Sequence, residues 1–151
     1  MGRRWPAGRS LPTPSVDGEK VLNSVYYLYQ MTRQQLKNSS KMLKKQCMGK
    51  TDTTEAQVGK IEQGVFIEEK AVMCYIACIY QMSQVVKNNK LNYEASLKQV
   101  DMMFPNDQKE ASKASIKNCK DIGTKYKDLC EASYWMAKCI YEDNPDNFIF
   151  A

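Results

Sequence analysis

Six cysteines are the residues of this chain whose type and spacing say most about its chemistry. They are Cys47, Cys74, Cys78, Cys119, Cys130 and Cys139, and the gaps between them hold 26, 3, 40, 10 and 8 residues. Cys74 and Cys78 fall one turn apart on an expected helix, where Cβ atoms are roughly 5–6 Å apart. A disulfide needs a Cβ separation of roughly 3.5–4.5 Å, so we expect each of these two to bond to a different, more distant cysteine. Six cysteines allow fifteen pairings, and spacing alone does not choose among them.

The chain contains no histidine. This absence removes the commonest general base, metal ligand and physiological pH switch, and it excludes Ser-His-Asp and Cys-His catalytic sites. A zinc site usually has closely paired ligands at both ends of its sequence motif, whereas Cys74 and Cys78 are the one close pair here. Acidic pairs such as Glu68-Glu69 and Glu142-Asp143 fall at expected helix ends, where solvated charge is typical. We therefore expect a protein that is not an enzyme and holds no metal and no cofactor.

Hydrophobic periodicity predicts an all-α fold that positions these cysteines. A Thr54–Gln57 capping box starts the second expected helix, a nearly all-apolar stretch marks the third as buried, and Lys87–Lys90 reads as a polar loop. No alternation typical of strands is present. The expected helices span about Met31 to Gly49, Thr54 to Gly64, Glu68 to Val86, Tyr93 to Pro105, Asp107 to Gly123 and Lys127 to Glu142.

The totals favour one globular domain. The 151 residues are 43% hydrophobic and 26% charged, which suits a single core. The net charge of +5 is spread along the chain between acidic residues, so we expect no binding of nucleic acid. No run of about 18 apolar residues occurs, so we expect no insertion into a membrane.

All five cysteine gaps, with Cys74 and Cys78 on one helix, are similar to the pattern of the insect odorant-binding proteins. The resemblance covers about Thr32 to Ala151. It implies a compact bundle of about six helices around a central apolar cavity, closed by three disulfides. Carried onto this chain, the family's pairing implies Cys47–Cys78, Cys74–Cys130 and Cys119–Cys139.

The resemblance divides the chain into an atypical extension over 1–30 and an odorant-binding-protein-like helical domain over 31–151. Residues 1–20 are rich in proline and glycine and are expected to be disordered. They hold no apolar stretch of roughly 7–15 residues that would mark a secretory signal. The family is nevertheless secreted, and we expect an extracellular location.

Residues on the faces that carry the cysteines, or beside them, are candidates to line the cavity, although each of them could equally be ordinary core. From the first helix to the third, and just beyond it, the candidates are Leu43, Val65, Phe66, Ile76, Tyr80, Ser83, Val85 and Val86. From the following loop to the sixth helix, they are Leu91, Leu97, Val100, Ser133, Tyr134, Met136, Ala137 and Ile140.

The apolar end of the chain adds three further candidates, Phe148, Ile149 and Phe150. The resemblance implies that they fold back as a lid over the ligand, while surface packing and dimerisation are the alternatives. Hydroxyls such as those of Tyr80 and Tyr134 are the available polar anchors and favour a longer or aromatic ligand with one polar group. Without histidine, we do not expect acid-triggered release.

Three functions are compatible with these patterns. The first is a soluble carrier of small hydrophobic ligands such as odorants or pheromones in olfaction, with a chemosensory receptor as a further partner and a homodimer as a further state. The second is a disulfide-stapled interaction protein with a filled core that binds a protein partner. The third is an intracellular helical protein with free thiols. We expect the first, because the cysteine pattern and the apolar tail both agree with it.

Overall fold

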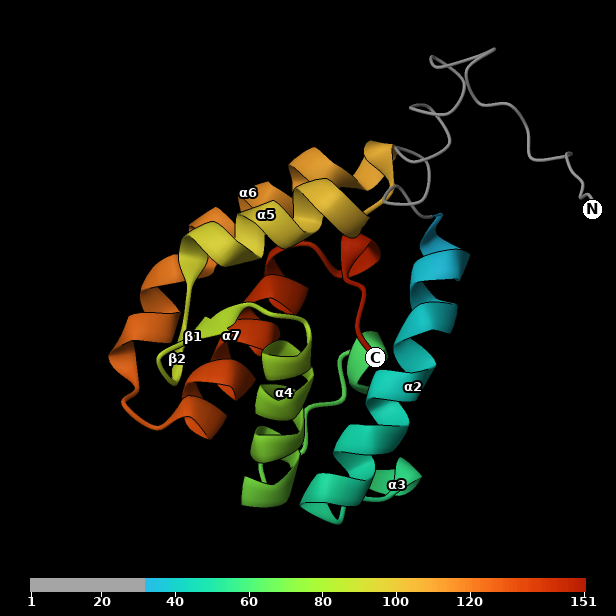
Figure 1. Ribbon diagram of the computed structural model, residues 1–151. Helices are drawn as coiled ribbons and strands as arrows, with labels where there is room; N and C mark the ends of the chain where they lie inside the picture. Colours follow the sequence, from blue (N-terminus) through green and yellow to red (C-terminus); the bar gives the residue numbers. More distant parts are fainter. Residues whose placement is uncertain (1–31) are drawn as a thin grey trace, which may run out of the picture.

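Helices form most of residues 32–151, the part of the chain that this computed structural model describes (Figure 1). The all-α class is confirmed, and the expected extension over 1–30 lies outside the described residues. None of the helices in the described part is long and apolar enough to cross a membrane. In chain order, the elements are α2 (Arg33–Thr51), α3 (Glu55–Val58), η3 (Ile61–Gln63), α4 (Lys70–Met82), β1 (Val86–Lys87), β2 (Lys90–Leu91), α5 (Tyr93–Met103), α6 (Asn106–Lys125), α7 (Leu129–Asp143) and η4 (Pro145–Asn147).

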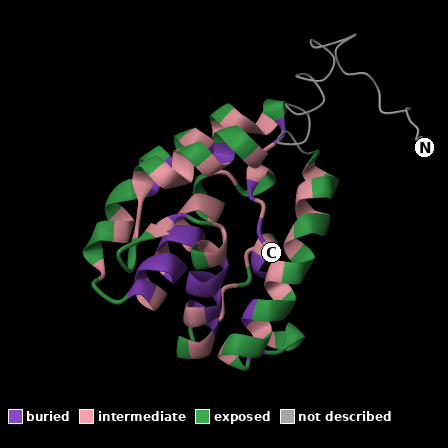
Figure 2. Cartoon of the chain, viewed as in Figure 1, coloured by how far each residue is buried: buried purple, intermediate pink, exposed green. Residues whose placement is uncertain are grey.

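The centre of the fold is the contact between α4 and α7. Val72, Tyr75 and Ile76 of α4 and Ala137 of α7 have no exposed surface. α2 packs on α4, α6 packs on α7, and α5 packs on α6. The buried residues are therefore concentrated on α4 and α7, whereas α2 is largely exposed (Figure 2).

Three disulfides join these helices in the pairing that the resemblance implies. Cys47–Cys78 ties α2 to α4, Cys74–Cys130 ties α4 to α7, and Cys119–Cys139 ties α6 to α7. By the chain-entropy model, each closed loop stabilises the fold by about 3–4 kcal/mol. No cysteine of the described residues is free, so the intracellular thiol protein expected as the third alternative does not fit this structure.

Several helix boundaries differ from the sequence-based prediction. The prediction ended some helices at glycine residues, whereas the structure ends α2 and α6 at other turns of the backbone. α2 continues past Gly49 to a left-handed residue, Asp52. The second expected helix is two pieces, α3 and η3, ended by Gly64 at φ 92°. α6 runs through Gly123 to Lys125.

A two-stranded hairpin replaces the expected polar loop and the last turn of the expected third helix. α4 ends at Met82, and Gln84 takes a positive φ of 64°. Val86 then pairs with Leu91, and Lys87 pairs with Lys90. The two asparagines between the strands both adopt positive φ, which is the backbone that a tight hairpin turn requires and that asparagine tolerates. Strands of two residues are too short to show alternation in sequence.

The segment after α7 turns back into the molecule. After η4, Phe148 and Phe150 are 4% and 8% exposed. The chain end lies between α2 and the ends of α4 and α7 in Figure 1. The tail is thus packed into the core, and its contact with a ligand stays a prediction.

Candidate ligand-binding site

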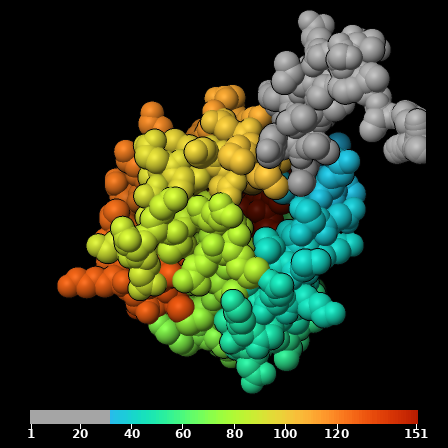
Figure 3. Space-filling model, viewed as in Figure 1, coloured from blue at the N-terminus to red at the C-terminus, as the bar shows by residue number. Residues whose placement is uncertain are grey.

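A cavity of about 750 Å³ lies between α5 and α6 on one side and α4, α7 and the tail on the other. α2 borders it as well, through residues of its N-terminal half. The space-filling view shows a hollow between α2 and α5, and the dark red C-terminal segment is visible at its bottom (Figure 3). A cavity of this size falls in the range of small-molecule sites, roughly 300–1,000 Å³.

The lining is mainly apolar, with a minority of hydroxyl and amide groups and three lysines. From α2 and α4 to β2, it consists of Leu36, Ser39, Ser40, Leu43, Ile79, Tyr80, Met82, Ser83, Gln84, Val85, Lys87 and Leu91. From the start of α5 to α6, it consists of Asn92, Tyr93, Ala95, Ser96, Lys98, Gln99, Val100, Met102, Met103, Phe104, Ser112, Ser115, Ile116, Lys120, Gly123 and Thr124. From α7 to the tail, it consists of Met136, Ile140, Asn144, Asn147, Phe148, Ile149, Phe150 and Ala151.

Aromatic rings of the tail form one wall of the cavity. Phe150 meets Tyr80 edge to face, with 5.9 Å between ring centroids. Phe148 and Phe150 stack on each other at 5.8 Å, and Phe148 also packs against Tyr141. Edge-to-face and offset stacking at these distances are favourable, so the tail joins the cavity wall to the core behind it.

Polar contacts hold this tail in place from three directions. The guanidinium of Arg33 donates to the carbonyl of Phe148 at 2.8 Å. The amide of Phe150 donates to Glu62 at 3.2 Å, and Lys37 pairs with the same carboxylate at 2.9 Å. The hydroxyl of Tyr75 donates to the carbonyl of Ala151 at 3.1 Å. These hydrogen bonds and the ion pair hold the extended tail in place, although it does not pair with a β-strand.

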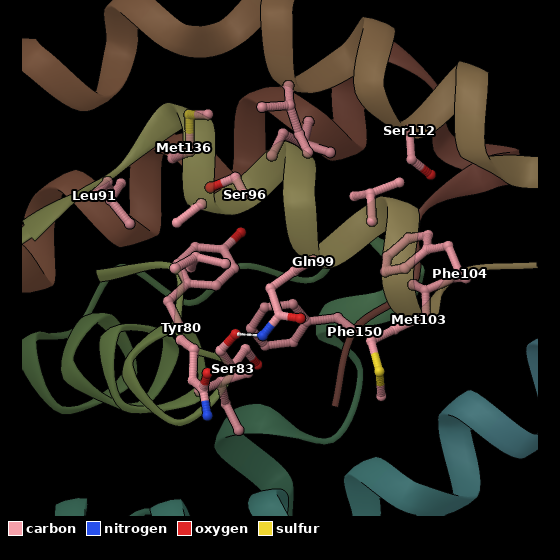
Figure 4. A pocket seen from close by; sticks show the side chains of 18 of the residues that line it. Tyr80, Ser83, Leu91, Ser96, Gln99, Met103, Phe104, Ser112, Met136 and Phe150 are labelled. Atoms are coloured by element: carbon pink, nitrogen blue, oxygen red, sulfur yellow. Dashed lines mark hydrogen bonds between the residues drawn. The ribbon is translucent and has the colours of Figure 1, made fainter. Parts of the chain in front are cut away.

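The hydroxyl of Tyr80 points into the cavity in Figure 4, toward the side where Leu91, Ser96 and Met136 lie. Burial raises the pKa of Tyr80 well above its usual range, so the hydroxyl stays protonated in ordinary solution conditions. No residue of the described chain hydrogen-bonds to it. It can therefore donate to, or accept from, a bound molecule.

Several other polar groups at the cavity wall are already engaged within the protein. Ser96 donates to the carbonyl of Asn92 at 2.9 Å. Gln99 donates from its amide nitrogen to the carbonyl of Ser83 (Figure 4). Ser115 donates to Asp143 at 2.7 Å. The hydroxyls of Tyr80, Ser83 and Tyr93 form no hydrogen bond within the described residues, so these are lining hydroxyls that a ligand can use.

Eleven of the nineteen residues predicted from sequence line this cavity. They come from every part of the prediction, including the whole tail segment: Leu43, Tyr80, Ser83, Val85, Leu91, Val100, Met136, Ile140, Phe148, Ile149 and Phe150. Their contact with a ligand remains a prediction.

The other eight predicted residues do not line the cavity. Four lie inside the protein core, each 0–1% exposed: Ile76, Ser133, Tyr134 and Ala137. Phe66 packs against the rings of Tyr134, Tyr141 and Phe148. Val65 is 44% exposed, Val86 is in β1, and Leu97 packs in a second cluster around Val100 and Ile116.

Sequence reasoning missed most of the α5 and α6 wall. The α5 residues Ser96, Gln99, Val100 and Met103 follow the i, i+3, i+4, i+7 spacing of one helix face, and all four line the cavity. Two of them are polar, so a search for apolar residues selected only Val100 of this face, together with Leu97 of the neighbouring one. The helix period was the signal that could have identified this face.

The described residues offer no cluster of three or more His, Cys, Asp or Glu that could hold a metal ion. Lys44–Glu55 and Lys113–Asp101 are exposed ion pairs and border no part of the cavity. The site is thus a largely apolar, partly open cavity in which Tyr80 offers one of the hydroxyls that have no partner among the described residues.

Comparison with known proteins places these features in a family. The model of the PBP/GOBP family matches residues 29–143. The chain is similar to general odorant-binding protein 72 of Anopheles gambiae, with 34% identity over 120 residues that cover 80% of this chain and 98% of that protein.

Two solved structures share the fold. Odorant binding protein 4 of Chrysopa pallens is 34% identical, with a TM-score of 0.71 over 80% of this chain and all of that one. Apis mellifera odorant binding protein 5 is 25% identical, with a TM-score of 0.72 over 81% of this chain and 99% of that one.

Proposed function

Because this chain belongs to the PBP/GOBP family, we propose that the cavity bounded by α5, α6 and the tail is where it holds its ligand. The family's proteins are carriers of small hydrophobic molecules, and the relatives that match here are odorant-binding proteins. The observation that carries the proposal is the cavity of about 750 Å³ with a mainly apolar lining. A disulfide-stapled protein with a filled core, the second function considered from sequence, does not fit such a volume.

The ligand is taken up without covalent change. The carrier acts by moving apolar surface out of water, which contributes roughly 25 cal/mol per Å². Methionines such as Met82, Met103 and Met136 at the wall support this, because their flexible thioether side chains adapt to ligands of different shape. No catalytic group is required for this activity.

Tyr80 gives the mainly apolar site a directional contact. Its hydroxyl offers the ligand a hydrogen bond that no described residue takes, and a ligand without a partner for it would leave the hydroxyl unpaired. A bonded carbonyl, ester or hydroxyl oxygen on the ligand therefore gains about 0.5–1.5 kcal/mol. The preferred ligand is an apolar molecule with one acceptor oxygen.

Displacement of a fluorescent apolar probe from the purified, oxidised chain tests this proposal. Ser96 lies at the cavity wall (Figure 4), so the large side chain in Ser96→Trp should fill the space and abolish saturable uptake. Met42 is 69% exposed on α2, so Met42→Trp is the matched control and should bind as the unaltered chain does. Uptake that survives in Ser96→Trp, in a protein with unchanged circular dichroism, would place the ligand elsewhere.

Location and partners follow from the same family membership. Proteins of this family are secreted, and we propose the same for this chain, since its three disulfides suit an oxidising compartment. Transfer of the ligand to a chemosensory receptor and formation of a homodimer stay predictions.

A further inference from the structure

We propose that the cavity is suited to an amphiphile with an apolar chain and a single anionic end group, and that Lys87 and Lys120 hold that end group at the β1–β2 hairpin. A long-chain carboxylate is the simplest molecule of this kind. The inference rests on the proposed function, because it assumes that the cavity holds the ligand.

The charged side chains of the cavity wall are all positive. Three lysines, Lys87, Lys98 and Lys120, belong to the lining, and no aspartate or glutamate does. The sequence as a whole is far more balanced, with 22 Lys and Arg against 17 Asp and Glu. A site lined by one sign of charge with apolar walls focuses the electrostatic potential toward the opposite charge.

Lys87 and Lys120 border the same end of the cavity, although they are distant in sequence. Lys87 is in β1 and faces Lys90 across the hairpin, which adds a second positive charge there. A Cβ built on Gly123, one turn beyond Lys120 in α6, would lie 3.4 Å from the side chain of Leu91 in β2. The end of α6 therefore lies against the hairpin.

Tyr93 marks where this charged end meets the cavity. The ammonium of Lys120 lies 5.1 Å from the centroid of the Tyr93 ring, and Tyr93 itself lines the cavity. The cation is thus held beside an aromatic wall rather than directed away from the protein. An anionic group of a ligand bound at this end of the cavity would lie close to the ammonium of Lys120.

Like most lysines of the described residues, these two have no carboxylate partner, whereas four other lysines do. Lys37, Lys44, Lys70 and Lys113 each form an ion pair at 3.2 Å or less with Glu62, Glu55, Asp128, and Asp101 and Glu110, respectively. Within residues 32–151, neither Lys87 nor Lys120 is in such a pair. An anionic ligand that reaches them therefore displaces no carboxylate side chain of the described residues.

Competition between laurate and methyl laurate tests the inference, since the two share a chain and differ in charge. At neutral pH and low salt, laurate should displace a neutral fluorescent probe about fivefold more tightly than the ester, as expected for two exposed ion pairs. Raising the salt from about 0.01 M to about 1 M shortens the Debye length from about 30 Å to about 3 Å and should remove the difference.

Two double variants separate the local effect from the net charge. Lys87→Gln with Lys120→Gln should remove the preference for laurate while leaving the affinity for methyl laurate unchanged. Lys41→Gln with Lys45→Gln removes the same charge from exposed positions of α2 outside the lining and should retain the preference.

Each result decides the inference. Equal affinities for acid and ester in the unaltered chain, or a preference that survives Lys87→Gln with Lys120→Gln, would overturn it while leaving the carrier function intact. Failure of the probe, the acid and the ester to bind at all would overturn the proposed function as well. All variants change exposed side chains, and unchanged thermal unfolding verifies that they fold.

Discussion

Replacement of Tyr80 by phenylalanine should separate ligand binding from stability. The change removes a hydroxyl that makes no hydrogen bond with the described residues and keeps the ring that packs edge to face on Phe150. The empty protein loses no internal bond, so its free energy of unfolding should stay the same or rise by up to about 1 kcal/mol. The ligand, in contrast, loses its directional partner.

The expected loss of binding follows from the strength of one hydrogen bond. A net contribution of about 1 kcal/mol corresponds to about a fivefold weaker Kd. Two ligands of nearly equal size, 2-acetylnaphthalene and 2-ethylnaphthalene, differ in the single acceptor oxygen. Probe displacement should show that Tyr80→Phe weakens the acetyl compound about fivefold and leaves the ethyl compound unchanged.

Tyr134→Phe is the matched control. Its hydroxyl is buried and donates to the carbonyl of Phe66 at 2.8 Å, so this variant should lose about 1–2 kcal/mol in urea unfolding without changing the selectivity between the two ligands. If Tyr80→Phe lost stability as Tyr134→Phe does, or kept full selectivity for the acetyl compound, the assignment of Tyr80 as the polar contact would be wrong.

Three further results follow from the structure. Burial raises the pKa of Tyr80 and Tyr75, so above about pH 10 the unfolded chain loses these protons while the folded chain keeps them. The free energy of unfolding should therefore fall by up to about 1.4 kcal/mol per pH unit for each tyrosine. Urea unfolding at several pH values should show this fall, and it should be less steep in Tyr80→Phe. Phe150→Ala should cost about 3 kcal/mol of stability in the same assay, whereas a change below about 0.5 kcal/mol would mean that the tail contributes no core. Amides of α5 should exchange hydrogen faster than those of α4, and bound ligand should slow α5 most; equal protection in the two helices, measured by mass spectrometry, would contradict this.

The fold was predictable because its signals are local or countable. The gaps between cysteines and the helical periodicity can be read from the sequence without knowledge of tertiary contacts. Together they identified the all-α class and the family. Helix ends were less predictable. Gly123 lies inside α6 and Asp52 ends α2, since a glycine is tolerated within a helix and a left-handed turn can form at an aspartate.

The cavity wall was harder to predict than the fold, because α4 and α7 each have more than one buried face. Ile76 and Ala137 are fully buried between the two helices, while Tyr80 and Met136 border the empty volume. An apolar side chain is expected to be buried, but its type does not determine whether it packs against other protein atoms or borders a cavity. That distinction depends on how α5 and α6 are placed, which no local pattern contains.

The distribution of the disulfides explains how a protein with a large cavity beside its core remains folded. The three bonds connect α2, α4, α6 and α7 into one crosslinked unit, which includes the densely packed contact between α4 and α7. α5 carries no cysteine and packs mainly on α6, yet it supplies much of the cavity wall. The wall that a ligand contacts is therefore the part of the fold held least by covalent bonds. A bound ligand would supply the contacts that α5 lacks on its inner face, so binding and ordering of this helix should be coupled.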